Sequence, residues 1–219
     1  MSFSTARPSL VVPVDFSPAS TAALRYGQHL SERAGAELHL LHIHRPSERH
    51  DDASADKARL AAFAEGAGVS IAGAVLAERA GDHPAQGIIA YAQEVGAELI
   101  VMSRLGARGL RRFLIGSQTD EVLRALPCTL LVLPEALAEA PHVHHLLVPV
   151  DLTSVSAPLI RAAREFAARY GDAARLTVLH ALEPLPYAGG WMSGVAFGLD
   201  DSLGTSIAGE VQALSLIHI

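Results

Sequence analysis

Short apolar runs alternate with amphipathic segments along the first 135 residues of the chain. The runs cover residues 10–14, 38–43, 69–76, 98–102 and 129–133, and their lengths suit strands buried on both faces. The segments between them, 18–34, 52–65, 83–95 and 117–126, are predicted to be helices. Strands that alternate with helices form right-handed βαβ units, so the pattern predicts an α/β fold with a parallel sheet.

Local signals define the ends of these helices. Ser17 followed by Pro18 is typical of a helix start, and Gly35 is typical of the position just past a helix end. Asp82 and Ser117 are predicted to cap the third and fourth helices.

The first strand and its turn recur later in the chain. Residues 10–17 read LVVPVDFS and residues 146–153 read LLVPVDLT, with Asp15 matching Asp151 and Gly35 matching Gly171 in one register. We interpret this as a tandem duplication: a first domain over 1–135, a linker over 136–145 and a second domain over 146–219. The second copy has no counterpart of the fourth strand, the loop after it or the fifth strand, so we expect it to be truncated.

Composition narrows the classes of function. Half of the 219 residues are hydrophobic, and the net charge of -6 argues against a nucleic-acid binder. The single cysteine, Cys128, excludes an intrachain disulfide and a multi-cysteine zinc site. No apolar run approaches the length of a membrane span, so we expect a cytoplasmic protein without membrane partners.

The segment from Ser103 to Ser117 carries the chemistry that the sequence suggests. It joins the fourth strand to the fourth helix, and Gly106 and Gly116 allow a close approach of the backbone to a ligand. The N–H groups of Gly116, Ser117 and Gln118 are expected to point out of the helix N-terminus, where a phosphate can bind. In a parallel sheet this loop meets Asp15 and the segment 42–44 at the carboxyl ends of the strands.

These residues resemble the universal stress protein family. Its pattern Gly-x2-Gly-x9-Gly-Ser is similar to Ser103-x2-Gly106-x9-Gly116-Ser117. The first strand with its turn, the Gly81-Asp82 pair and the segment 127–134 also resemble the family, and the likeness covers residues 8–135.

The resemblance implies an open sheet of five parallel strands flanked by helices, of the adenine-nucleotide alpha-hydrolase-like type. It also implies a stress-response role, with ATP or a related adenine nucleotide, and Mg²⁺ with it, bound at the strand ends as a regulatory ligand. Asp15 and the backbone near Ile43 would face adenine or ribose, and the loop glycines and helix start would hold phosphates. The site residues implied are Pro13, Val14, Asp15, Ile43, Met102, Ser103, Gly106, Gly116, Ser117 and Gln118.

One departure bears on this expectation. The family's first glycine is Ser103 here, which would cost about 1 kcal/mol or more if the position needs a positive φ. The chain also lacks a P-loop motif, and its only lysine is Lys57. A dedicated kinase or fast ATPase is therefore disfavoured, and at most slow ATP hydrolysis is expected.

Other interpretations stay open. A degenerate site would leave an interaction module that does not bind nucleotide, and His42 and His44 share a strand face that could bind metal or serve structure. Cys128 could be a redox sensor or an inert thiol. The run Thr129–Leu133 is expected at a sheet edge, where it could pair with a second copy or with the second domain.

Overall fold

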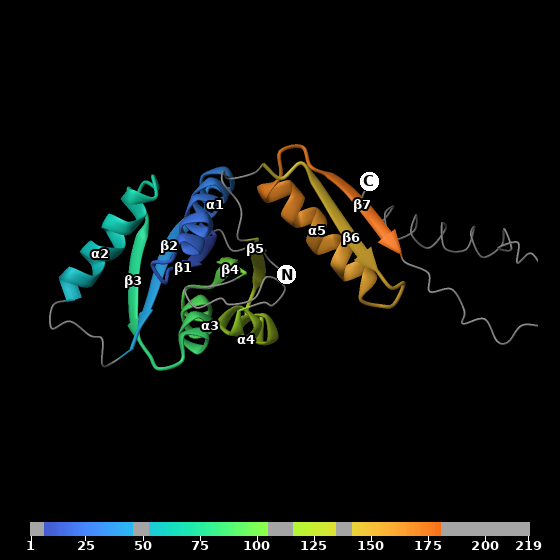
Figure 1. Ribbon diagram of the computed structural model, residues 1–219. Coiled ribbons are helices and arrows are strands. Elements are labelled where there is room, and N and C mark those ends of the chain that lie inside the picture. Colours follow the sequence, from blue (N-terminus) through green and yellow to red (C-terminus); the bar gives the residue numbers. More distant parts are fainter. Residues whose placement is uncertain (1–6, 46–52, 105–115, 135–141, 181–219) are drawn as a thin grey trace, which may run out of the picture. The chain divides into compact units, whose positions relative to one another are not determined.

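The computed structural model describes residues 7–45, 53–104, 116–134 and 142–180 (Figure 1). The chain divides into two compact units, Met1–Pro141 and His142–Ile219. Within the described residues, no helix is both long enough and apolar enough to cross a bilayer.

The first unit is built on a sheet of five parallel strands in the order β3-β2-β1-β4-β5. The strands are β1 (Ser9–Pro13), β2 (Glu37–His44), β3 (Val75–Ala80), β4 (Ala97–Ser103) and β5 (Thr129–Leu133). The predicted fold class is confirmed, and β5 lies at an edge of this sheet as expected.

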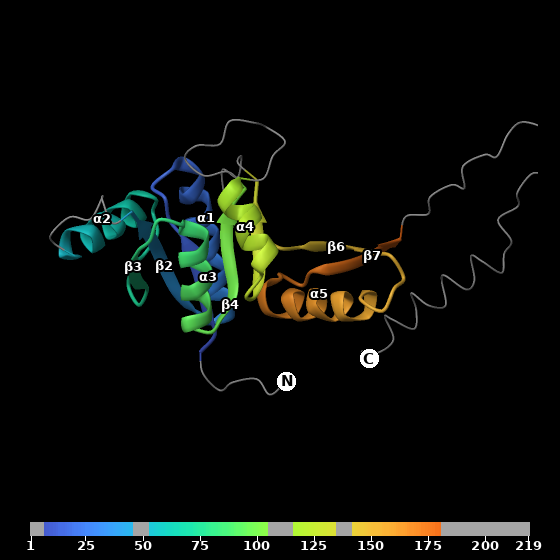
Figure 2. The same ribbon diagram turned by 90° about the horizontal axis from the view of Figure 1, so that it is seen from below.

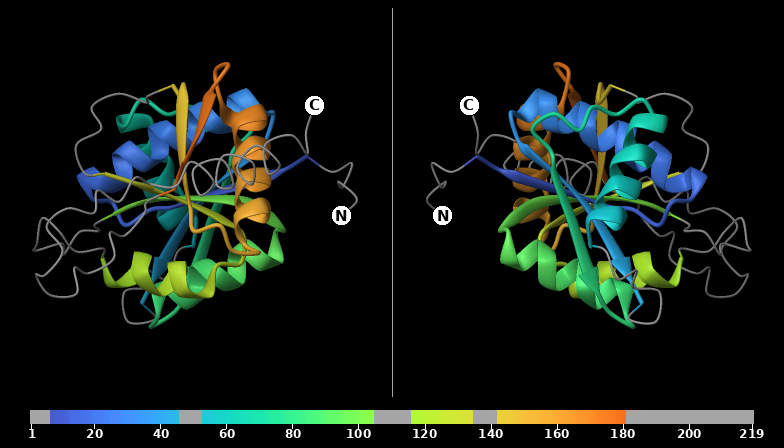
Figure 3. Two further views of the ribbon diagram at one scale, coloured as in Figure 1. Left: turned by 90° about the vertical axis from the view of Figure 1, so that its right-hand side faces the viewer. Right: turned by 90° about the vertical axis from the view of Figure 1, so that its left-hand side faces the viewer.

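Helices cover both faces of this sheet. The helices are α1 (Pro18–Ala34), α2 (Ala53–Gly66), α3 (Pro84–Glu94) and α4 (Ser117–Ala125). In Figure 3, α1 and α2 lie on one face, and α3 and α4 lie on the other. Figure 2 shows α3 and α4 side by side.

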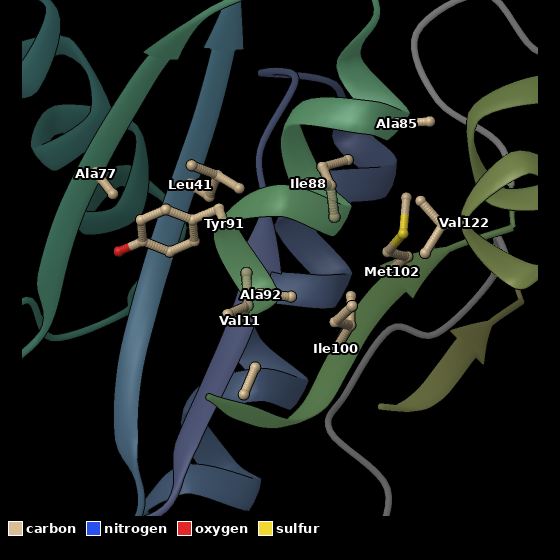
Figure 4. Packing of buried hydrophobic residues seen from close by; sticks show 11 residues of the cluster. Val11, Leu41, Ala77, Ala85, Ile88, Tyr91, Ala92, Ile100, Met102 and Val122 are labelled. Atoms are coloured by element: carbon tan, nitrogen blue, oxygen red, sulfur yellow. The ribbon is translucent and has the colours of Figure 1, made fainter. Parts of the chain in front are cut away.

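The core under α3 and α4 explains why the strands read as continuous apolar runs. Val11, Leu41 and Ile100 come from three neighbouring strands and are fully buried. Above them lie Ile88 and Tyr91 of α3, as Figure 4 shows. The alternate residues of the same strands face α1, so both faces of the sheet are buried and require apolar side chains.

The third strand is displaced from its predicted position. The pattern predicts a strand over 69–76, but β3 begins at Val75. The Gly68 N–H donates to the Glu65 carbonyl and the Val69 N–H donates to the Ala64 carbonyl, with Gly68 at φ +74°. This closes α2 with a Schellman motif, so the first apolar residue of the run serves as a helix cap.

Two predicted caps are also wrong by one residue. His83 is the N-cap of α3 in place of Asp82, and Gly116 is the N-cap of α4, so Ser117 is the first helical residue. Ser17 and Gly35 cap α1 as predicted, with Gly35 in the left-handed conformation at φ +60°.

The described part of the second unit, residues 142–180, contains a parallel strand pair and one helix: β6 (His145–Val150), α5 (Ser156–Tyr170) and β7 (Arg175–His180). Leu10 pairs with Leu38 in the first unit, and the matching residues Leu146 and Leu176 pair in the second. The first two strands of each unit therefore pair in the same register. The segment 142–145, assigned to the linker from sequence, already hydrogen-bonds within this unit, since the Arg175 N–H donates to the His144 carbonyl.

Candidate functional site

The strand order places the candidate site between β1 and β4. These strands are neighbours, and the chain leaves β1 toward one face of the sheet and β4 toward the other. Ligands of open α/β sheets bind at such a switch point, beyond the carboxyl ends of the strands. Here the two ends carry the segment Val14–Asp15 and the segment Ser103–Arg104.

Asp15 shapes the turn that follows β1. Its Oδ1 accepts hydrogen bonds from the Ser17 N–H at 3.1 Å and from the Ser17 hydroxyl at 2.5 Å. The Ser17 Oγ in turn accepts a hydrogen bond from the Ser20 N–H at 3.2 Å, which caps α1. The carboxylate is exposed, so it stabilises the turn and faces solvent at the site.

Phe16, the residue between them, has φ +60° although it is not glycine. This backbone is costly for a bulky residue, and the ring contacts hold it in place. The Phe16 ring lies 4.5 Å from the His42 ring and 5.3 Å from the Phe63 ring. The Arg59 guanidinium lies 4.1 Å from the centre of the same ring, a cation–π contact. The role of Arg59 could not be predicted from the sequence, because its partner Phe16 lies in a turn that is distant along the chain.

His42 connects β2 to the same turn. Its Nδ1 donates to the Val14 carbonyl at 2.7 Å, because a carbonyl oxygen can only accept. Burial lowers the pKa of His42, and the Val14 bond opposes that effect only in part. The imidazole is therefore neutral near pH 7, with its proton on Nδ1 and a lone pair on Nε2.

The two ends of the loop after β4 are tied together. The Gly116 N–H donates to the Arg104 carbonyl at 2.8 Å, and the Arg104 N–H donates to the Leu133 carbonyl at 2.8 Å. The Thr119 hydroxyl also donates to the Ser103 carbonyl at 3.1 Å. The loop therefore leaves and returns at one point beside the sheet edge. Gly106 lies outside the described residues.

One of the three N–H groups that were expected to face a phosphate already has an acceptor within the chain. The Gly116 N–H is used by Arg104, while the N–H groups of Ser117 and Gln118 have no acceptor within the helix. The Gln118 side chain has a separate role, since its Oε1 accepts from the Ala85 N–H at 2.8 Å. That bond caps α3, whose own N-cap residue makes no side-chain cap.

The serine in place of the family's first glycine fits without strain. Ser103 is the last residue of β4, pairs with Leu133 and is not among the described residues with positive φ. The expected backbone penalty therefore does not apply.

Four further expected residues belong to the core or to the sheet. Met102 is 7% exposed and belongs to the core under α3 and α4. The Ile43 side chain lies against α3, where a Cβ on Gly87 would come within 2.9 Å of it. Val14 is also buried, and its N–H donates to the Leu41 carbonyl, while Pro13 pairs with Leu41 in the sheet.

The second unit repeats the turn geometry. The Asp151 Oδ1 accepts from the Thr153 N–H at 3.0 Å and from the Thr153 hydroxyl at 2.7 Å. These bonds hold the pKa of Asp151 below its ordinary value. Leu152 has φ +59°, like Phe16, and the His180 Nδ1 donates to the Val150 carbonyl at 2.8 Å. A cavity of about 310 Å³ adjoins this turn.

Comparisons with known proteins agree with the fold. A model of the universal stress protein family matches residues 7–134. A functionally unknown protein from Pseudomonas aeruginosa PAO1 is 21% identical, with a TM-score of 0.64 over 96% of this chain and 69% of its own. A universal stress protein from Archaeoglobus fulgidus DSM 4304 is 16% identical, with a TM-score of 0.56 over 94% of this chain and 74% of its own. A universal stress protein in complex with cAMP is 22% identical, with a TM-score of 0.47 over 60% of this chain and 100% of its own. No curated protein matches the chain in sequence.

Proposed function

The chain belongs to the universal stress protein family, and from that premise we propose that its first unit binds ATP or a related adenine nucleotide as a regulatory ligand. The observation that carries the proposal is the hydrogen bond between the Gly116 N–H and the Arg104 carbonyl. It fixes both ends of a glycine-containing loop at the switch point of the sheet, beside the start of α4. A phosphate bound there would meet helix N–H groups and the positive end of the helix dipole.

The proposed contacts follow from this placement. The N–H groups of Ser117 and Gln118 would bind phosphate, together with the backbone at Gly106. The exposed Asp15 carboxylate and the backbone of Val14 and Ile43 would bind ribose and adenine from the neighbouring strands. Mg²⁺ would enter with the nucleotide, held by its phosphates.

The ligand would act by population shift. A nucleotide that binds one conformation or assembly state better than another stabilises that state by its differential affinity. Fast hydrolysis is not part of the proposal, since the sequence has no P-loop lysine among its residues.

The experiment has two readouts. Purified protein is denatured and the supernatant tested for adenine nucleotide, and Tm is measured with and without ATP. We expect released nucleotide or an ATP-dependent rise in Tm. Absence of both would reject nucleotide binding.

A matched pair of variants locates the site. Gly116 has φ -60° and ψ 148°, a backbone that valine adopts readily. Gly116→Val should therefore fold but lose the ATP-dependent rise in Tm, because the side chain blocks the approach to the helix start. Gly66→Val is the control, since Gly66 ends α2 and a Cβ there meets nothing within 4 Å. Equal ATP responses in the two variants would show that the loop is not the site.

A second function, assembly, is supported by the position of β5 at the edge of its sheet. Strand β5 pairs only with β4 among the described strands, so its other side can pair with a second copy or a second domain. We expect Leu131→Lys to shift the chain toward monomers in sedimentation velocity. Leu123→Lys on the exposed surface of α4 serves as the control.

A further inference from the structure

A polar cluster lies beneath α2 on the side of the sheet away from α3. His42 and His44 project from the same face of β2, since strand side chains repeat every two residues, and their rings stack 6.3 Å apart. Glu78 of β3 is the ladder partner of His42 and therefore shares that face. Asp56 of α2 is only 8% exposed although it carries a carboxylate. We call these four residues the polar cluster.

Polar atoms of the cluster are buried without partners. Both ring nitrogens of His44 and the Glu78 Oε1 are shielded from solvent and make no hydrogen bond within the described part of the chain. Native proteins rarely leave such atoms unsatisfied, and each exception asks for an explanation such as an ion. The two carboxyl groups also oppose each other. Burial raises the pKa of Glu78, and the nearby Asp56 charge raises it further.

His42 has the arrangement that metal-ligating histidines usually show. A histidine that binds a metal through one nitrogen commonly donates its other N–H to a backbone carbonyl or carboxylate. The His42 Nδ1 donates to the Val14 carbonyl at 2.7 Å, so the lone pair is on Nε2. Two positive groups lie nearby. The Arg59 guanidinium lies over the Phe16 ring, and the charge of the exposed Lys57 opposes the rise in the pKa of Glu78.

From this geometry we infer that the polar cluster binds a divalent transition-metal ion of the zinc type, with His42, His44, Glu78 and Asp56 as candidate ligands. Two imidazoles and two carboxylates form a donor set that suits a four-coordinate zinc ion. In the structure as described, the donor atoms of these side chains do not gather at one point, so binding must turn at least one of them. His44 can turn without losing a hydrogen bond, because its ring makes none.

This site is distinct from the nucleotide site proposed above, but it shares a backbone segment with it. The carbonyl that orients His42 belongs to Val14, immediately before the Asp15 turn. Zinc binding can therefore be tested without nucleotide. A negative result for one of the two sites does not decide whether the other site exists.

The test is a zinc titration of the full chain by isothermal calorimetry, without nucleotide. Glu78→Gln removes the carboxylate while keeping its shape, and His44→Ala removes one imidazole. We expect each variant to lose the tightest zinc site or to weaken it by at least about tenfold. His83→Ala is the control, since His83 is exposed at the start of α3 and outside the cluster. It should bind zinc like the parent protein.

Two results would overturn the inference. One is equal zinc affinity and stoichiometry in the parent, Glu78→Gln and His44→Ala. The other is loss of the tightest site only when His142 and His144, which lie outside the first unit, are replaced by alanine. If His44→Ala does not fold, as judged by circular dichroism, Glu78→Gln decides the question alone.

Discussion

Replacement of Gly27 by alanine tests how closely α1 must approach the sheet. Gly27 is buried in the middle of α1, and a Cβ built on it would collide with Cγ2 of Val12 in β1. Val12 is fully buried, and its β-branched side chain has few alternative rotamers, so it cannot move aside at low cost. The helix would have to shift away from the strand.

The magnitude follows from two opposing effects. Alanine in place of glycine stabilises a helix interior by about 1 kcal/mol, whereas overpacking of a well-packed core costs about 1–3 kcal/mol. We therefore expect Gly27→Ala to lower the free energy of unfolding by up to about 2 kcal/mol. Because α1 begins at the Asp15 turn, the shift should also reduce any ATP-dependent rise in Tm.

The assay is urea denaturation of the full chain followed by circular dichroism. Gly66→Ala is the matched control: the same change at the end of α2, where the new Cβ meets no atom within 4 Å. It should leave stability unchanged or raise it by up to about 1 kcal/mol. A Gly27→Ala protein at least as stable as Gly66→Ala would refute the close-approach explanation.

Three other predictions follow from buried polar groups. Tyr91→Phe removes the hydroxyl that lies 2.9 Å from the His39 Nδ1 and should cost about 1–3 kcal/mol in urea denaturation, because the ring nitrogen keeps no partner there. Burial lowers the pKa of His39 and of His42 below 6.5, so the unfolded chain binds more protons and the folded state loses stability as pH falls below 6.5. Thermal unfolding between pH 7.5 and pH 5.5 should show a falling Tm, with a smaller fall in His39→Gln; a Tm that rises in the parent would contradict the sign. Burial raises the pKa of Cys128 to about 11, so only about a thousandth of the thiol is ionised at pH 8, and iodoacetamide should react slowly with the native protein but rapidly in urea. Equal rates in the two states would show that the thiol is not shielded.

The first unit shows which parts of a fold can be predicted from local pattern. The strand Thr129–Leu133 is found at its predicted residues, because an apolar run between a helix end and a proline leaves little choice. The predicted start of the third strand at residue 69 is wrong. Val69 is apolar for another reason, because it takes part with Gly68 in the bonds that close α2. A helix cap and a strand start can use the same residue types, and only the path of the chain distinguishes them.

The features of the candidate site likewise fall into two groups: those that the sequence predicts and those that depend on the tertiary structure. The Asp15 turn follows from residue types with few possible roles. The helix after the loop begins at Ser117 within its predicted range, although its N-cap is Gly116 and not Ser117. The use of the Gly116 N–H by Arg104 could not be predicted, because it depends on where the loop returns. The Gln118 bond to Ala85 was likewise hidden, since these residues meet only when α3 and α4 lie side by side.

The sequence by itself determined the alternation of strands and helices, the parallel sheet and the repeat of the first strand with its turn. Periodicity, glycine and proline act through neighbours along the chain, so these features can be read in order. The tertiary structure alone decided which polar groups face each other. His42 meets Val14 and Glu78 because strand order places β2 between β1 and β3, and that order is set by packing helices on both faces of one sheet.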